Sequence, residues 1–186
     1  MSLLTDRTWK LKYTVEDGDL LRRFYIPALE CAVRYDRTTG YFTAGALAAA
    51  ARGVEELVRN SGRMRLIVGC TLGEAEIQAI SKGEGLRQTL DNKLSDTPLR
   101  PQDQEAMDAM ELLAWMVAKG YLEVKVAVPC NPNRLPVASN AIFHEKTGII
   151  EDKTGDRIAF SGSINETEHG WRYNWDSFHV FTSWSG

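Results

Sequence analysis

Residues 143–165 read FHEKTGIIEDKTGDRIAFSGSIN and predict a strand, a tight turn and a second strand. His144 and Lys146 open the first apolar run, and the segment ends on Gly-Ser-Ile-Asn. Because alternate side chains of a strand share one face, these two are expected to point the same way, about 6–7 Å apart along the backbone. The segment therefore predicts a β-hairpin with a polar pair at its start.

The turn of this hairpin, Asp152-Lys153-Thr154-Gly155-Asp156, has a composition that favours chain reversal. Gly155 tolerates a positive φ, and Asp side chains bond nearby backbone amides. Reversal brings Ser163 and Asn165 back toward the level of His144. An imidazole, an ammonium, a hydroxyl and an amide then converge on a small space. That set suits a tetrahedral phosphate, which the imidazole attacks and the other groups stabilise through its non-bridging oxygens.

These residues closely resemble the HKD motif of the phospholipase D superfamily, His-x-Lys-x(4)-Asp-x(6)-Gly-Ser-x-Asn. The positions that match are His144, Lys146, Gly162, Ser163 and Asn165. The acidic position holds Glu151, with Asp152 next to it, and the gap to Gly-Ser is four residues longer, which a lengthened turn absorbs. The odd offset from His144 places that acid on the opposite strand face, so it is predicted to be structural. The alternative is an exposed His and Lys on a sheet beside an ordinary Gly-Ser turn.

The resemblance implies hydrolysis of a phosphodiester through a covalent phosphohistidine, with His144 as the nucleophile. Lys146 would neutralise the phosphate oxygens, and Ser163 and Asn165 would donate hydrogen bonds to them. Asp176 stands in a segment that resembles the family's Asn-x-Glu, whose acid orients the histidine. The chain holds one HKD copy where the superfamily uses two, so a homodimer must supply the second imidazole. No metal or cofactor is implied.

The chain has 186 residues, 44% of them hydrophobic, and a net charge of −3. This length buries one good core and predicts one domain over residues 1–186. The acidic balance excludes a global electrostatic grip on nucleic acid, so such binding must rest on a local basic surface. The absence of a long apolar run and of a signal peptide predicts no membrane attachment or secretion. The chain ends soon after a strand-like run, as an N-terminal fragment of a longer protein would.

Hydrophobic periodicity places strands and helices in alternation. Besides the hairpin, the expected strands are Lys10–Val15, Val33–Phe42, Arg65–Cys70 (buried on both faces), Tyr121–Val128 and Ser177–Thr182. The expected helices are Asp17–Ala32 with a kink at Pro27, Ala44–Arg59 capped by Thr43, a short one at Gly73–Ser81, and Gln102–Lys119, while Lys82–Arg100 and Pro129–Pro136 are expected to be loops. This order predicts an α/β fold of the phospholipase D type, a mixed sheet flanked by helices on both faces.

Other chemistry has weaker support from residue spacing. The set His144, His169, His179 and Cys130 lacks zinc-ligand spacing. Ser163 lacks the Gly-x-Ser-x-Gly elbow of an esterase. The cysteines Cys31, Cys70 and Cys130 form no CxxC pair, which predicts reduced, mostly buried thiols in a cytoplasmic protein.

Two surface clusters leave alternatives open. The aromatic residues Trp171, Tyr173, Trp175 and Trp184 either stack on bases or, more commonly, pack in the core or in a dimer interface. The arginines Arg34, Arg37, Arg63 and Arg65 form either a basic edge or, more commonly, a solvated face.

The residues and the resemblance together predict a metal-independent phosphodiesterase, a nuclease rather than a lipase, acting on nucleic acid and on DNA above all. TGYF, HEKTGIIED and GSINETEHGW most resemble phospholipase D-like domains attached to bacterial Swi/Snf- or DEAD-type helicases, which implies a C-terminal helicase motor. The alternative is a non-catalytic DNA-binding or dimerisation module of a helicase or restriction-like protein, favoured by the altered acidic position and the pI near 5.7. The sequence does not indicate whether the substrate is DNA or RNA, or whether it is single-stranded or double-stranded.

Overall fold

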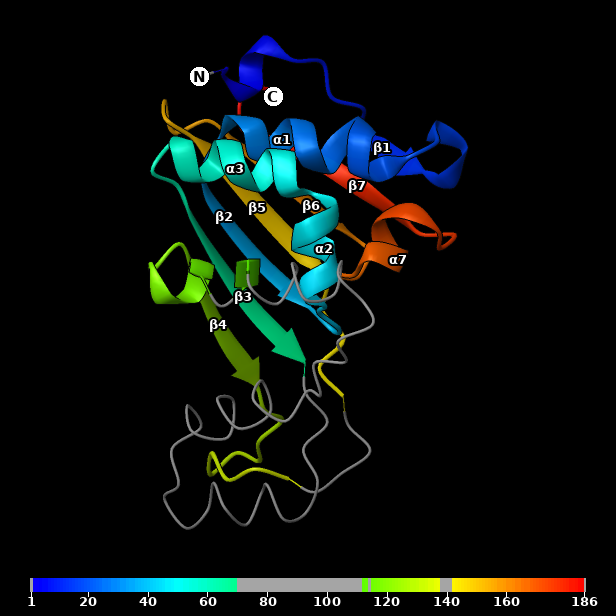
Figure 1. The fold of residues 1–186 in the computed structure, drawn as a ribbon. Helices are drawn as coiled ribbons and strands as arrows, with labels where there is room; N and C mark the ends of the chain where they lie inside the picture. The colour runs from blue at the N-terminus through cyan, green and yellow to red at the C-terminus, as the bar shows by residue number, and fades with distance from the viewer. Residues whose placement is uncertain (1, 70–111, 114, 138–141, 186) are drawn as a thin grey trace, which may run out of the picture.

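The computed structural model describes residues 2–69, 112–113, 115–137 and 142–185. Within these ranges seven strands form one mixed sheet in the order β1-β7-β6-β5-β2-β3-β4 (Figure 1). The strands are β1 (Lys12–Thr14), β2 (Ala32–Thr39), β3 (Arg63–Gly69), β4 (Leu122–Ala127), β5 (Thr147–Asp152), β6 (Arg157–Gly162) and β7 (Ser177–Thr182). The pairs β2–β3 and β3–β4 are parallel, and the other neighbours are antiparallel. The hairpin β5–β6 thus lies at the centre of the sheet.

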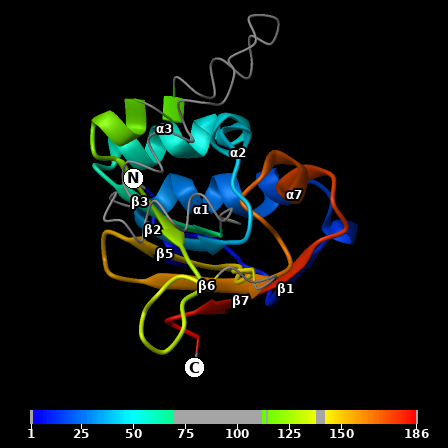
Figure 2. The ribbon, with the colours of Figure 1, turned by 90° about the horizontal axis from the view of Figure 1, so that it is seen from below.

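The labelled helices lie on one side of the sheet (Figure 2). They are α1 (Ile26–Cys31), which follows a π-helical segment Leu21–Tyr25, α2 (Ala44–Ala49), α3 (Ala51–Arg59) and α7 (Glu168–Arg172), with short 3-10 turns at Leu4–Asp6 and Val15–Asp17 and helical residues at 112–113 and 115–118. Strand side chains alternate accordingly. Tyr35, Leu66 and Ile150 are buried, whereas Arg65 and Ile149 are exposed on the other face.

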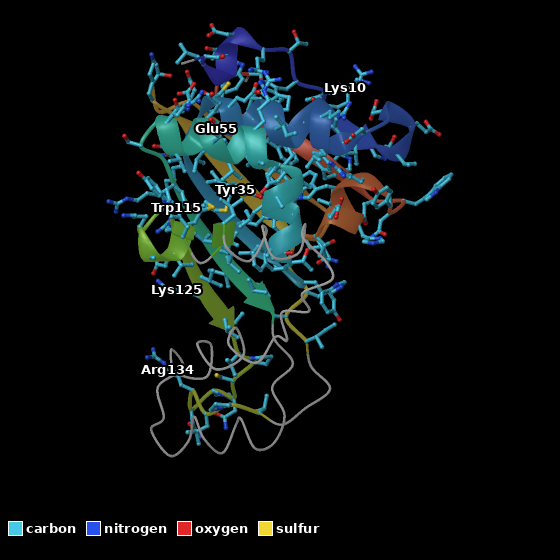
Figure 3. The ribbon with its side chains drawn as sticks, in the orientation of Figure 1. Lys10, Tyr35, Glu55, Trp115, Lys125 and Arg134 are labelled. Carbon is cyan, nitrogen blue, oxygen red and sulfur yellow. The ribbon has the colours of Figure 1, made fainter. Side chains whose placement is uncertain are left out.

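The core between the sheet and the helices is rich in aromatic rings. Phe24 of the π-helical segment meets Phe160 of β6 edge to face, with ring centroids 5.1 Å apart. Trp171 of α7 stacks on Tyr25 with ring centroids 4.3 Å apart. Tyr35, labelled in Figure 3, lies in the same layer. This packing fixes α7, which directly follows the Gly-Ser-x-Asn segment, against the sheet.

Two predicted helices differ from the structure. The helix expected over Asp17–Ala32 begins at Leu21, and its first turn is π-helical. That turn lies directly before Pro27, which lacks an N–H donor and crowds the preceding turn, so the predicted kink takes the form of a widened turn. The helix expected over Ala44–Arg59 is two helices, because the backbone departs from helical angles at Ala50 (φ −95°, ψ 17°). The alanine-rich sequence does not indicate this break. The break at Ala50 allows α2 to pack on α7.

The other elements agree with their predictions, with two corrections. The last strand has the predicted bounds, and the predicted mixed sheet with helices is confirmed, although the labelled helices lie on one face of the sheet and not on both as expected. The expected burial of Arg65–Cys70 on both faces is wrong, since Arg65 and Ile67 are exposed. The segments Gly73–Ser81 and Lys82–Arg100, and most of Gln102–Lys119, lie outside the described residues. Among the described helices none is both long and apolar enough to cross a bilayer.

Candidate active site

The β5–β6 hairpin forms as the sequence predicts. Thr147 pairs with Ser161, and the turn holds Gly155 at a φ of +88°. Directly outside the paired strands, the Gly162 N–H donates to the Lys146 carbonyl oxygen over 3.4 Å. The Gly-Ser-x-Asn segment therefore returns to the level of the His-x-Lys pair.

His144 and Asn165 meet beside Gly40, just beyond the end of β2. A β carbon added to Gly40 would lie 3.3 Å from Asn165 Oδ1 and 3.3 Å from His144 Cδ2. Gly69, at the end of β3, is also closely approached, because a β carbon there would lie 2.5 Å from the Phe143 carbonyl oxygen. The exposed His144 side chain thus stands over two strand ends that have no room for larger residues. The imidazole and the amide oxygen therefore both lie against Gly40.

Lys146 lies directly before β5 and is only 5% exposed. Its Nζ donates to the His144 carbonyl oxygen over 3.1 Å, which holds the ammonium beside the histidine backbone. Burial lowers the pKa of Lys146 below its ordinary value, and the charge of nearby Arg37 lowers it further. The carboxylates of Asp176 and Glu145 act in the opposite direction. A cation with so little water around it attracts a phosphate oxygen more strongly than an exposed one does.

The Ser163 hydroxyl is bonded to the carboxylate that precedes β7. Its Oγ donates to Asp176 Oδ1 over 2.5 Å and accepts from the Ser177 N–H over 3.1 Å. Within the described ranges Asp176 bonds Ser163 rather than His144, so the predicted orienting contact is not formed inside the single chain. The second carboxylate oxygen, Asp176 Oδ2, is buried and has no hydrogen-bond partner among the described residues. A buried acceptor of this kind is open to an N–H donor.

Asn165 is oriented by the backbone that follows β2. Its Oδ1 accepts from the Tyr41 N–H over 3.2 Å and from Thr39 Oγ1 over 3.5 Å. The Thr39 hydroxyl also accepts from the Glu166 N–H over 2.9 Å, which anchors the next residue of the loop. With its oxygen engaged, the Asn165 side chain has its amide nitrogen left to donate to a ligand.

A buried ion pair lies beneath this loop. Arg37 of β2 donates from Nε to Glu166 Oε2 over 3.0 Å, and both side chains are 0% exposed. Arg37 Nη2 donates to the Ile164 carbonyl oxygen. The remaining side-chain donors to the Glu166 carboxylate are the hydroxyls of Tyr25 and Tyr35. Arg37 therefore ties the loop to β2 on both sides of Asn165.

The burial of Arg37 divides the arginine cluster that the sequence analysis treated as one group. Arg34, Arg63 and Arg65 are exposed, whereas Arg37 is 2% exposed. The alternation of β2 carries the signal, because Arg37 shares a parity with Tyr35 and Thr39 on the buried face. A fully buried arginine requires a partner acid, and Glu166 follows the motif asparagine directly. Sequence reasoning missed both members of this pair.

The acidic position of the motif needs a correction. Glu151 forms a partly exposed pair with Arg157 across the hairpin, at 2.7 Å. Asp152 instead is 1% exposed and accepts from the N–H groups of Leu4 and Thr154, each over 2.9 Å. Burial alone would raise the pKa of Asp152, but these bonds and that of the Thr154 hydroxyl outweigh it and hold the pKa below its ordinary value. The structural acid of the hairpin is therefore Asp152, not Glu151.

The other candidate residues are dispersed. His169 on α7 and His179 on β7 are exposed, Cys130 is exposed, and Cys31 is buried, while Cys70 lies outside the described residues. In the part of the chain that the structure describes, no group of three or more His, Cys, Asp or Glu side chains is placed to hold a metal ion. Trp171 belongs to the core, whereas Tyr173 and Trp175 are exposed.

A hollow of about 220 Å³ lies over strands β5, β2, β3 and β4, and its lining does not include His144. Most of its lining comes from the sheet face opposite the helices, including Asp36, Arg65 and Lys125. Asp36 pairs with Arg65 through two hydrogen bonds of 2.6 Å, so the local charges there already offset one another. We therefore place the candidate site at the ends of β2 and β5 and not in this hollow.

Comparison with known proteins finds similarity in structure. No protein family and no curated protein matches the sequence. The chain is similar to the structure of NucT from Helicobacter pylori, with a TM-score of 0.52 and 13% identity over 92% of this chain and 82% of that one. This likeness shows a shared fold, and the predicted phospholipase D-like fold class is confirmed.

Two further similar structures have lower scores. A mutant of yeast tyrosyl-DNA phosphodiesterase has a TM-score of 0.46 and 10% identity over 91% of this chain, which spans 30% of that enzyme. Nuc from Salmonella typhimurium, a phospholipase D family member, has a TM-score of 0.42 and 15% identity over 91% of this chain and 79% of that one.

Proposed function

We propose that this chain is a phosphodiesterase of the phospholipase D superfamily that cleaves nucleic acid, DNA above all, without a metal ion. The observation that carries the proposal is the convergence of the motif side chains. His144 and Asn165 both lie against Gly40, and the Lys146 ammonium is held against the histidine backbone. An imidazole nucleophile, a desolvated cation and an amide donor are the groups that phosphoryl transfer through a covalent intermediate requires.

The proposed reaction has two displacements at phosphorus. In the first, a ring nitrogen of His144 bonds to phosphorus while the bond to the leaving oxygen breaks, and a second imidazole gives that oxygen a proton. In the second, water attacks the phosphohistidine, the phosphorus–nitrogen bond breaks, and the second imidazole takes the proton of the water. Lys146 and Asn165 stabilise the charge on the phosphate oxygens in both steps, and Ser163 joins them when its proton turns from Asp176 to the phosphate.

The second imidazole is proposed to be His144 of another copy of the chain. One HKD set per chain makes a homodimer with a shared cleft the simplest source of two imidazoles. The free Oδ2 of Asp176 would accept the N–H of one of these imidazoles and fix its tautomer, as in any base–orienter pair. We also propose, from the resemblance of the segments quoted above, that the chain works next to a C-terminal helicase motor in the cytoplasm.

Cleavage in excess EDTA tests the proposal. A labelled DNA oligonucleotide is expected to be cut by the wild type, and His144→Ala is expected to lose at least about 10³-fold in rate, because it removes the nucleophile. His179→Ala is the matched control, since His179 is exposed on β7 and lies outside the site. Activity that requires added metal, or that survives in His144→Ala, would place the chemistry elsewhere.

A second candidate is a non-catalytic DNA-binding or dimerisation module. Its support is that the site of a single chain brings together one imidazole and that Asp176 bonds Ser163 instead of that imidazole. This reading predicts a DNA complex in a gel shift without cleavage and without a covalent intermediate. The EDTA experiment therefore separates the two candidates.

A further inference from the structure

Three aromatic side chains near the candidate site are exposed to solvent. Tyr41 is 60% exposed, Tyr173 is 61% exposed and Trp175 is 89% exposed, whereas Trp171 of α7 is 1% exposed. A single exposed aromatic ring is common on protein surfaces. Three exposed aromatic rings on the two segments that bind the motif side chains require an explanation.

Two of these aromatic residues are linked to the hydrogen bonds of the candidate site. One takes part in such a bond through its backbone, and the other is the neighbour in sequence of a residue that does. Trp175 precedes Asp176, whose carboxylate accepts from the Ser163 hydroxyl over 2.5 Å. Tyr41 donates its N–H to Asn165 Oδ1 over 3.2 Å. Each of the two backbone positions therefore lies next to one of the residues proposed to donate a hydrogen bond to the phosphate, Trp175 next to Ser163 and Tyr41 next to Asn165.

The backbone at two of these rings, Tyr41 and Tyr173, is anchored. The Tyr41 carbonyl oxygen accepts from the Thr39 hydroxyl over 2.7 Å and from the Glu166 N–H over 3.2 Å. The Tyr173 N–H donates to the His169 carbonyl oxygen over 2.9 Å, and its ring lies edge to face against the His169 ring, with centroids 5.2 Å apart. Rings on fixed backbone lose little conformational freedom when a flat partner stacks on them.

The chemistry of these neighbours selects one kind of partner. A nucleic acid strand carries a phosphate and a flat base in each repeat. This repeat matches a surface on which hydrogen-bond donors to a phosphate lie next to exposed aromatic rings. A duplex keeps its bases stacked inside and is held mainly through phosphate charge, for which a chain of net charge −3 is poorly suited. A single strand presents its bases to aromatic rings.

We propose that Tyr41, Tyr173 and Trp175 form a stacking platform that makes this chain select single-stranded nucleic acid. Bases on either side of the bound phosphate stack on these rings while Lys146 and Asn165 hold the phosphate itself. The inference rests on the proposed function, since it takes the motif residues as the phosphate site. The inference adds that the substrate is single-stranded, and it names the residues that select a single strand.

Binding to the non-cleaving His144→Ala chain tests the platform. Fluorescence anisotropy compares a labelled single-stranded oligonucleotide with a duplex of the same sequence at one fixed salt concentration. The single strand is expected to bind at least tenfold more tightly. Adding Trp175→Ala or Tyr41→Ala is expected to weaken single-strand binding by about 5- to 150-fold, with less effect on the duplex, and Trp175→Phe is expected to retain most of the affinity.

Phe181→Ala is the matched control, because Phe181 is an aromatic residue 62% exposed on β7, on the sheet face away from the helices. It is expected to change binding less than twofold. Equal affinity for single strand and duplex, no measurable binding of either, or losses no larger than that of Phe181→Ala would overturn the inference. So would a change in sedimentation coefficient with unchanged binding, which would assign the rings to contact between copies of the chain.

The platform and the proposed function can fail separately. Hydrolysis of bis(p-nitrophenyl) phosphate by the wild type in EDTA reports on the phosphodiesterase chemistry alone. If that activity is present but the aromatic variants bind single strands normally, the platform is wrong and the function stands. If the activity is absent but the aromatic variants lose single-strand binding, the function is wrong and the platform stands as part of a binding module.

Discussion

Lys146 is buried at a cost in stability, and we propose that this burial serves phosphate binding. The residue is 5% exposed and its ammonium lies near the charge of Arg37, so its pKa is lowered first by burial and then by that charge. A lowered lysine pKa means that the folded state disfavours the charged form. That cost is complete below the folded pKa and fades as the pH rises through it toward the ordinary value of about 10.4.

Replacing this ammonium is therefore expected to stabilise the fold. Lys146→Met should raise the free energy of unfolding at pH 7 by about 0.5–2 kcal/mol, measured by urea denaturation, and the gain should shrink near pH 10.5. The same variant should bind inorganic phosphate more weakly. A variant less stable than the wild type at pH 7 would show that the charge is better compensated than described above.

Asp152 has the opposite sign of pH dependence. Its carboxylate accepts the Leu4 N–H from the chain start and the Thr154 N–H within the turn, and its pKa is lowered. Such a group stabilises the fold fully above the ordinary pKa of about 3.9, and this contribution is lost as the pH falls through the folded pKa.

Asp152→Asn is accordingly expected to cost about 1–3 kcal/mol at pH 7, with the difference from wild type lost as the pH falls through the lowered pKa of Asp152 in the folded state. Glu151→Gln is the control, because its partly exposed pair with Arg157 contributes about 0–1 kcal/mol. Chemical denaturation across this pH range measures both. A larger effect at Glu151 than at Asp152 would return the structural role to the position that the motif alignment gives it.

At the scale of elements, the loop between β6 and α7 is anchored to β2 through the buried side chain of Arg37. Arg37 bonds the Glu166 carboxylate and the Ile164 carbonyl oxygen, so the residues before and after Asn165 are both fixed. Arg37→Met alone leaves a buried carboxylate without its ion pair, and we expect a loss of about 3–5 kcal/mol.

The double variant Arg37→Met/Glu166→Gln should recover much of that stability while catalysis stays impaired, because the loop has lost its anchor. Arg65→Met is the matched control, an exposed arginine of the same sheet for which about 0–1 kcal/mol is expected. Urea denaturation and turnover of the three variants separate folding from positioning. Full activity in the double variant would remove the positioning role.

The spacing of apolar residues and the residue types of the turn were enough to predict the strands that position the candidate site. Alternating apolar residues around a Gly155 turn predicted β5 and β6, and the last strand has its predicted bounds. The break at Ala50 was not predictable, because it follows from tertiary packing and not from the propensity of alanine. The motif singled out His144, Lys146, Ser163 and Asn165, but it did not predict that Arg37 and Glu166 support this loop or that Asp152 replaces Glu151 as the buried acid. Those contacts join segments far apart in sequence, and a local pattern does not report them.

At the scale of the whole molecule, the account requires two copies of the chain. The site of one chain brings together one imidazole, His144, and the two displacements at phosphorus need a nucleophile and an acid. A symmetric pair supplies both, and within each pair only one imidazole can be the nucleophile in a given cleavage event. A dimer should therefore carry a single phosphoryl group when it is stopped midway.

The most direct measurement of the central claim is trapping of the covalent intermediate. An oligonucleotide carrying ³²P at the cleaved phosphate is mixed with the protein in excess EDTA, quenched within one turnover and resolved under denaturing conditions. The account predicts label on His144 that is stable to base and labile to acid, about one label for two chains, and none in His144→Ala. Label that persists in His144→Ala, one that forms only with added metal, or cleavage that proceeds with no protein-bound label would contradict it.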